Sequence, residues 1–78
     1  MVSLAAAPQP PTLTLPHLTP REREVLALVA QGLTNSQIAR DLGLQRRTVE
    51  WHLEQVFTRL GVKARAEAVS VASRYGLL

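Results

Sequence analysis

The sequence predicts an all-α domain of four helices, preceded by a proline-rich N-terminal segment that is disordered or extended. Leu, Val and Ala make up most of the apolar residues, and this composition favours helix. Downstream of residue 17, apolar residues recur at helical spacing in four stretches, and a glycine follows each stretch. These four stretches with their glycine stops leave no segment for a sheet.

Residues 1–17 differ in composition from the rest of the chain. They contain no Asp, Glu, Lys or Arg, and they hold four of the five prolines, Pro8, Pro10, Pro11 and Pro16. Because proline fixes φ and lacks a backbone donor, we expect a linker or tail over 1–17 and a folded domain over 18–78. Two interpretations of the linker stay open: a disordered tail, or a tether to a further domain.

The first two helices have clear start signals. Thr19 precedes Pro20 and is followed three residues later by Glu22, which is the capping-box pattern. Thr34 and Gln37 repeat that pattern before the second helix. Glycines at 32 and 43 are placed to end the two helices. The predicted inward stripes consist of Val25, Leu26 and Val29, then Ile38, Ala39 and Leu42.

The third helix is predicted over about 46–60 and the fourth over about 65–75. At 100° per residue, the apolar residues of the third helix fall within about two-fifths of its circumference. Gln45 and Ala64 stand at the two N-cap positions, and a poor cap costs about 1 kcal/mol, so both starts should fray. The inward residues of the third helix are Val49, Leu53, Val56, Phe57 and Leu60.

Three residues around the turn between the second and third helices form a recognisable constellation. Ala39 is small where two helices cross closely, Gly43 can adopt the positive φ of a tight turn, and Val49 is a buried aliphatic residue. This spacing is typical of a helix-turn-helix, whose second helix enters the DNA major groove.

Composition excludes several classes of function. The 78 residues hold no cysteine, which removes disulfides and thiolate metal sites. His17 and His52 have no partner residues in the pattern of a metal or nucleophile site, so we expect no enzyme activity, metal or cofactor. No apolar run approaches the roughly 20 residues of a membrane span, and no signal peptide is apparent, so a cytoplasmic protein is expected. The net charge of +3 admits nucleic acid as a partner.

Residues 18–78 resemble the LuxR/GerE-type DNA-binding domain of bacterial transcription regulators. The resemblance rests on LTPREREVLALVAQGLTNSQIARDLGL, TVEWHL, RLGVKARAEAV and the closing GLL. It implies four helices, with the second and third forming the helix-turn-helix, and binding of double-stranded DNA as a dimer. It also implies control by a separate N-terminal sensor or receiver domain.

The outward face of the third helix contains the candidate site. Arg47, Trp51 and Glu54 point away from the inward stripe, and Glu50 flanks them. We expect Glu50, Trp51 and Glu54 to read base edges, because a carboxylate can accept from the cytosine amino group and an indole can pack on a thymine methyl. The residues expected to contact phosphates are Thr34, Asn35, Gln37, Arg46, Arg47, Thr48 and Lys63.

Other interpretations of this face stay open. On a solvated helix, Arg46 would pair with Glu50 and Arg47 would lie over Trp51. Alternatively, the acidic, Trp-bearing face would bind a protein, making the domain a protein-interaction module. A sigma-factor-like domain shares the pattern too. The salt dependence of binding separates DNA from protein partners.

The fourth helix has two apolar stripes. Ala66, Val69 and Ser73 would face the core. A second stripe would form a weak homodimer interface, as the family resemblance implies. Arg65, at the start of this helix, is expected to be solvated or to pair with Glu22 or Glu24. The residues expected at the dimer interface are Ala68, Val71, Ala72 and Tyr75.

Overall fold

The computed structural model describes residues 17–78, which form four helices and, within that range, no strand. The helices are α1 (Pro20–Ala30), α2 (Asn35–Leu42), α3 (Arg46–Leu60) and α4 (Arg65–Arg74). The predicted all-α class and the predicted bounds of the third helix are confirmed. Apart from His17, which is exposed, the proline-rich segment predicted over 1–17 lies outside the described residues.

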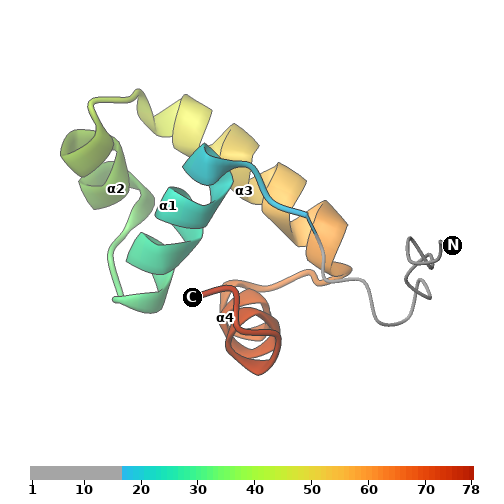
Figure 1. Ribbon diagram of the computed structural model, residues 1–78. Coiled ribbons are helices and arrows are strands. Elements are labelled where there is room, and N and C mark those ends of the chain that lie inside the picture. Colours follow the sequence, from blue (N-terminus) through green and yellow to red (C-terminus); the bar gives the residue numbers. More distant parts are fainter. Residues whose placement is uncertain (1–16) are drawn as a thin grey trace, which may run out of the picture.

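Helix α3 is the longest helix and packs against each of the other three. Figure 1 shows α1 running beside it, α2 at one side of this pair and α4 below. α1 also packs against α2 and α4, whereas α2 and α4 do not pack against each other. The domain is therefore a helix-turn-helix, α2 and α3, supported by α1 and closed by α4.

Both predicted capping boxes are present. The Glu22 amide donates to the Thr19 hydroxyl (3.1 Å) and the Thr19 amide donates to the Glu22 carboxylate (2.9 Å). Thr34 and Gln37 make the same reciprocal pair at 3.1 and 2.8 Å. Gln45 and Ala64 cap α3 and α4 without a side-chain hydrogen bond, as their side chains predict.

The turn of the helix-turn-helix depends on Gly43. Its φ of 68° is left-handed, and the Leu44 amide donates back to the Ala39 carbonyl at 2.8 Å, which ends α2. Only Gly43, Leu44 and Gln45 separate the two helices, so α3 leaves the turn at once. Ala39 and Val49 are both buried where the helices cross, which confirms the spacing argument.

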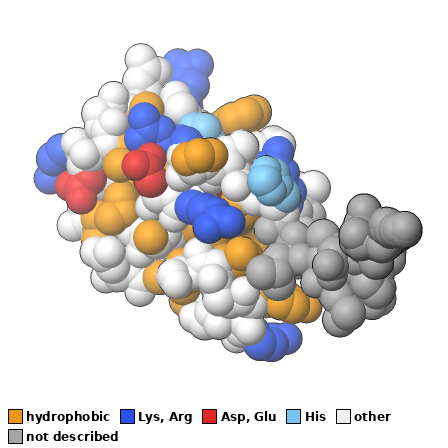
Figure 2. Space-filling model, in the orientation of Figure 1, with side chains coloured by type: hydrophobic (Ala, Val, Ile, Leu, Met, Phe, Trp, Pro, Cys, Tyr) orange, Lys and Arg blue, Asp and Glu red, His pale blue; other side chains and the backbone are white. Residues whose placement is uncertain are grey.

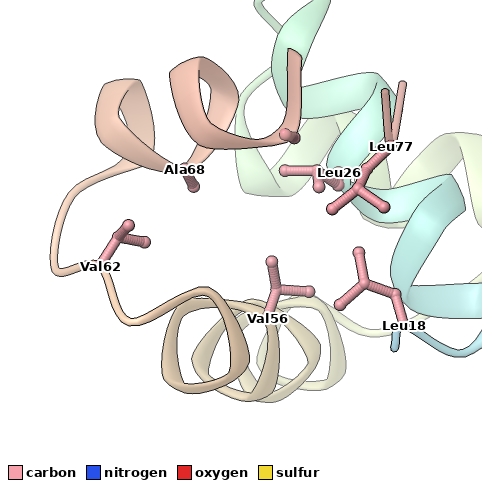
Figure 3. Close-up of a cluster of buried hydrophobic side chains, with 7 residues drawn as sticks. Leu18, Leu26, Val56, Val62, Ala68 and Leu77 are labelled. Atoms are coloured by element: carbon pink, nitrogen blue, oxygen red, sulfur yellow. The ribbon is translucent and has the colours of Figure 1, made fainter. Parts of the chain in front are cut away.

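Two groups of buried apolar side chains form the core. The first lies between α1, α3, α4 and the chain segments around them, and Figure 3 shows its side chains pointing toward a common centre. The second lies between α1, α2 and α3 and holds the helix-turn-helix together. Phe57, half-buried, packs against both. The first group is Leu18, Leu26, Val56, Val62, Ala68, Ala72 and Leu77, and the second is Val25, Val29, Ile38, Ala39, Val49 and Leu53.

The predicted orientation of α4 is wrong. Ala68 and Ala72 are 0% exposed and belong to the first core group, so neither can lie in a dimer interface. In Figure 3, Ala68 points from α4 into the space that the first core group fills. Of the three residues predicted to face inward, Ala66 and Ser73 are exposed, whereas Val69 does pack against the second core group. The reason is close packing: alanine lets the α4 backbone approach α1 and α3, and small side chains leave only a weak amphipathic signal.

One ion pair connects the start of α1 to the end of α3. Arg59 donates to the carboxylate of Glu22, whose side chain is only 3% exposed and which also completes the Thr19 capping box. Glu22 is the one buried charged residue in the described range. The expectation that Arg65 pairs with Glu22 or Glu24 is therefore wrong, because Arg59 takes Glu22 and Arg21 takes Glu24 at 3.1 Å.

Candidate nucleic-acid interface

The outward face of α3 presents the residues predicted to face away from the core. Arg47, Trp51, Glu54 and Thr58 are all exposed, and Trp51 retains 55% of its surface. Tyr75 and Leu78 are the other large apolar residues that the described range exposes, and both lie at the C-terminal end of the domain rather than on this face. Glu50, beside Trp51, is exposed too.

The acidic and basic side chains on this face are partly paired. Arg46 Nε lies 3.0 Å from Glu50 Oε2, one helical turn apart, and both side chains are largely exposed. An exposed pair of this kind stabilises a helix by only about 0.3–0.5 kcal/mol, so a partner can separate it at little cost. The pairing expected for a solvated face is thus present, and Arg46 partly compensates the charge of Glu50.

Trp51 contacts His52 rather than the Arg47 side chain. The two rings meet edge to face, with their centroids 5.2 Å apart, and no cation–π contact of Trp51 is found among residues 17–78. His52 is half-buried, and its Nδ1 has no hydrogen-bond partner among the described residues. The packing contact that the structure gives the His52 ring is this edge-to-face contact with the indole ring of Trp51.

A second feature adjoins the start of α3. An open depression lies where three helices begin: Asn35, Arg46 and Arg65 are the first residues of α2, α3 and α4, and all three line it. Helix starts have unpaired amides and a partial positive charge, and the two guanidinium groups add to it. No carboxylate lines the depression. Its complete lining is Gly32, Leu33, Thr34, Asn35, Ser36, Arg46 and Arg65.

The capping box decides which amides at the start of α2 remain available. The amides of Thr34 and Gln37 are taken by each other's side chains. Asn35 and Ser36 occupy the next two positions, where a helix has no internal acceptor for the amide. These two amides, together with the side chain of Asn35, are the groups left to meet an anion.

Arg65 lies at this depression, a place that local sequence does not predict. Its guanidinium donates from Nη1 to Asn35 Oδ1 at 2.6 Å and from Nη2 to the Leu33 carbonyl at 2.8 Å. The partners are about thirty residues away in the chain and on elements whose backbones do not pack together. No periodicity or motif relates such positions, so only the tertiary structure could reveal the contact.

The other residues predicted to contact phosphate are spread more widely. Arg47 lies on the outward face of α3, and Thr48 is half-buried behind it. Lys63 is exposed in the turn before α4, where its backbone amide donates to Glu67 at 3.2 Å, and it does not line the depression. Figure 2 shows Lys and Arg side chains scattered over the visible face rather than gathered in one patch.

Two kinds of feature are absent from the described residues, a metal site and a membrane span. No group of three or more His, Cys, Asp or Glu side chains within 17–78 is arranged to hold a metal ion. In the same range, none of the helices combines the length and the apolarity that crossing a bilayer requires. The features left for function are the outward face of α3 and the depression beside it.

Comparison with known proteins assigns this arrangement to a family. The family described as bacterial regulatory proteins, luxR family, matches residues 16–72. The chain belongs to the luxR family. Its α2 and α3 form the helix-turn-helix of a luxR-family DNA-binding domain. The resemblance inferred from the sequence motifs is confirmed.

Several named proteins of this kind are similar to the luxR-family chain. A probable transcriptional regulatory protein, SgaR of Hyphomicrobium methylovorum, is 51% identical over 57 residues, covering 73% of this chain and 27% of SgaR. The nitrate/nitrite response regulator NarL of Escherichia coli K12 is 47% identical over 52 residues, covering 67% of this chain and 24% of NarL. The chain thus spans about a quarter of the length of these relatives.

Solved structures share the fold. Transcription factor GerE superposes with a TM-score of 0.74 at 33% identity, covering 78% of this chain and 91% of GerE. The DNA-binding domain of the response regulator ComA, in complex with the anti-activator RapF, superposes with a TM-score of 0.72 at 44% identity, covering 73% of this chain and 98% of that domain.

Proposed function

We propose that this luxR-family domain binds operator DNA sequence-specifically, as a dimer, with α3 in the major groove. The observation that supports the proposal most directly is the outward face of α3, where Trp51 is 55% exposed between Arg47, Glu50 and Glu54. A helix inserted into the groove covers such a face, and its charged and polar side chains then meet base edges.

In the proposed complex, the start of α2 and the start of α3 meet the phosphates. The depression lined by Thr34, Asn35, Arg46 and Arg65 has a positive potential from helix ends and guanidinium groups, and no acid lines it. Arg47 and Thr48 in the first turn of α3 extend this contact, with Gln37 and Lys63 at its edge. Phosphate contacts set register and affinity but read no sequence.

Sequence would be read by Glu50, Trp51 and Glu54. A carboxylate accepts from the amino group of cytosine, and an indole packs against the methyl group of thymine. Acidic side chains also repel phosphates, so they lower affinity for the wrong sequences. The Arg46–Glu50 pair supports this role, because an arginine beside Glu50 moderates the repulsion while the helix approaches the backbone.

The dimer would use the exposed part of α4. Ala68 and Ala72 belong to the core, and Val71 is half-buried against the first core group, so Tyr75, 43% exposed, is the main residue that remains from the predicted interface. A two-fold arrangement would place two α3 helices in successive major grooves, about 34 Å apart. The remaining area is small, so the isolated domain should dimerise weakly.

We infer that a further domain controls this one. Relatives at 46% and 47% identity are named as response regulators, Rre1 of Synechocystis and NarL of E. coli, and the chain covers 26% and 24% of them. The matched part is thus a minor share of each relative. A receiver or sensor domain that pairs two copies would supply the dimer stability that α4 lacks, in a regulator that acts in the cytoplasm and has no catalytic role of its own.

Selection of the purified chain against a randomised duplex library, at near-physiological salt, tests the proposal. An inverted repeat among the selected duplexes is the expected outcome, with its half-site bases opposite Glu50, Trp51 and Glu54. Recovery of duplexes with no common sequence would contradict sequence-specific readout by this chain.

A second candidate function has one observation in its favour. The ComA DNA-binding domain, 44% identical to this chain, is found in complex with the protein RapF. In this chain, the acidic face around Trp51 would be the surface for a protein partner with basic side chains. Binding to DNA should fall with salt at a log–log slope of about −0.9 per phosphate neutralised, whereas a protein complex centred on Trp51 should depend on salt much less.

A further inference from the structure

The side chain of Arg65 connects two helices whose backbones do not pack against each other. It belongs to the first turn of α4, and its two donors reach Asn35 Oδ1 (2.6 Å) and the Leu33 carbonyl (2.8 Å) at the start of α2. The guanidinium group is half-buried, so this bridge is partly shielded from water.

The chemistry of arginine determines how the amide group of Asn35 is turned. A guanidinium group only donates, and therefore the atom of Asn35 that faces Arg65 is the carbonyl oxygen. The amide nitrogen of Asn35, with its two hydrogens, must then face the other way. Since Asn35 and Arg65 both line the open depression at the helix starts, the turned nitrogen has solvent and an anion within reach.

We infer that Arg65 is a positioning residue for DNA-backbone binding: it holds the Asn35 carbonyl oxygen and thereby presents the Asn35 amide hydrogens to a phosphate oxygen. The inference rests on the proposed function, in which the start of α2 meets a phosphate. It gives Arg65, expected to be an ordinary solvated charge, a role in DNA binding. It also makes the contact of α2 with the DNA backbone depend on the orientation of α4.

A first experiment uses the change Asn35→Asp in the complete 78-residue chain. Aspartate keeps an oxygen for Arg65, and a carboxylate in the first turn of a helix is favourable, so the melting temperature should stay level or rise. The phosphate, however, would meet a carboxylate instead of an amide. Affinity for a short labelled duplex of mixed sequence, at low salt, should fall about tenfold or more.

Arg23→Met is the matched control for charge. It also lowers the net charge by one, at an exposed position of α1 that does not line the depression. Its effect on affinity measures the general electrostatic contribution alone. If Asn35→Asp binds the duplex as well as Arg23→Met does, Asn35 does not meet a phosphate through its amide and the inference is overturned.

A double-mutant cycle then tests the role of Arg65. Arg65→Met should weaken binding more than Arg23→Met does, and this excess should be clearly smaller in the Asn35→Ala background, because Arg65 then has no amide to orient and contributes only its charge. Circular dichroism at the assay temperature gives the folded fraction of each variant, so that affinities refer to folded protein. An equal loss in both backgrounds would mean that Arg65 acts on DNA independently of Asn35, which contradicts the inference.

DNA binding by the unmodified chain distinguishes failure of the role given to Arg65 from failure of the proposed function. If it binds the duplex and the cycle is additive, only the role of Arg65 fails. If it binds no duplex even at low salt, where non-specific affinity is greatest, the proposed function fails and the inference with it.

Discussion

Glu22 and Arg59 form an ion pair that joins the first turn of α1 to the last turn of α3. The carboxylate is buried and also accepts from the Thr19 amide, whereas the arginine side chain is 40% exposed. The pair thus ties the start of α1, which supports the helix-turn-helix, to the C-terminal end of α3. Several measurable consequences arise from this and from the other contacts of the domain.

Arg59→Ala should lower the free energy of unfolding by about 1–2 kcal/mol, because it leaves the buried carboxylate of Glu22 without its charged partner. Urea denaturation followed by circular dichroism measures this. Arg21→Ala is the matched control, since its partner Glu24 is exposed and the loss should stay below about 0.5 kcal/mol. Equal losses of unfolding free energy in the two variants would show that the Glu22–Arg59 pair stabilises the domain no more than an exposed ion pair does.

Ala64→Ser should stabilise the domain by about 1 kcal/mol. The residue at 64 has the extended conformation of an N-cap but no side-chain acceptor, and Glu67 stands three positions later, so a hydroxyl would complete a capping box. Thermal or urea unfolding provides the measurement. Ala66→Ser, in the same helix, should be neutral or slightly destabilising, and a similar gain there would argue against the capping explanation.

Arg47→Ala and Glu50→Ala should distinguish a residue that contacts phosphates from a residue that contacts bases. Loss of a phosphate contact weakens all duplexes alike and reduces the steepness of the salt dependence by about 0.9. Loss of a base contact relaxes the preference at one base position, by about 1–3 kcal/mol. Binding to a panel of single-base variants of the selected operator measures both effects. Should Glu50→Ala strengthen binding to every sequence equally, its carboxylate repels phosphates and reads no base.

Tyr75→Ala and Ala68→Leu should separate self-association from stability. Tyr75 is exposed at the end of α4, so its truncation should weaken the dimer in sedimentation equilibrium and change unfolding by less than about 0.5 kcal/mol. Ala68 is fully buried, so a larger side chain should cost about 1–3 kcal/mol of stability. A weakened dimer from Ala68→Leu at unchanged stability would contradict the placement of Ala68 in the core.

Local chemistry made most of the fold predictable. The Thr19–Glu22 and Thr34–Gln37 boxes and the left-handed Gly43 act within a few residues of the chain, so their hydrogen bonds and φ angles appear in the structure where the spacing places them. The outward face of α3 was equally predictable, because Val49, Leu53 and Val56 are large apolar residues that define the opposite face without ambiguity.

Helix α4 was less predictable because its side chains are small. Ala66, Ala68 and Ala72 differ little from one another in the free energy of burial, so a sequence pattern cannot choose which of them faces inward. The choice depends on how closely the α4 backbone approaches Val56 and Val62 on the neighbouring segments. That approach is a property of the assembled domain.

The sequence by itself determined the helices, their caps, the helix-turn-helix and the family, because each depends on residues close together in the chain or on a motif of fixed spacing. Only the tertiary structure decided which charges pair and which alanines are buried. Arg59 reaches Glu22, and Arg65 reaches Asn35, across thirty residues or more. Such partners are determined by how α1, α2, α3 and α4 pack in space, and the spacing of residues along one helix does not predict that packing.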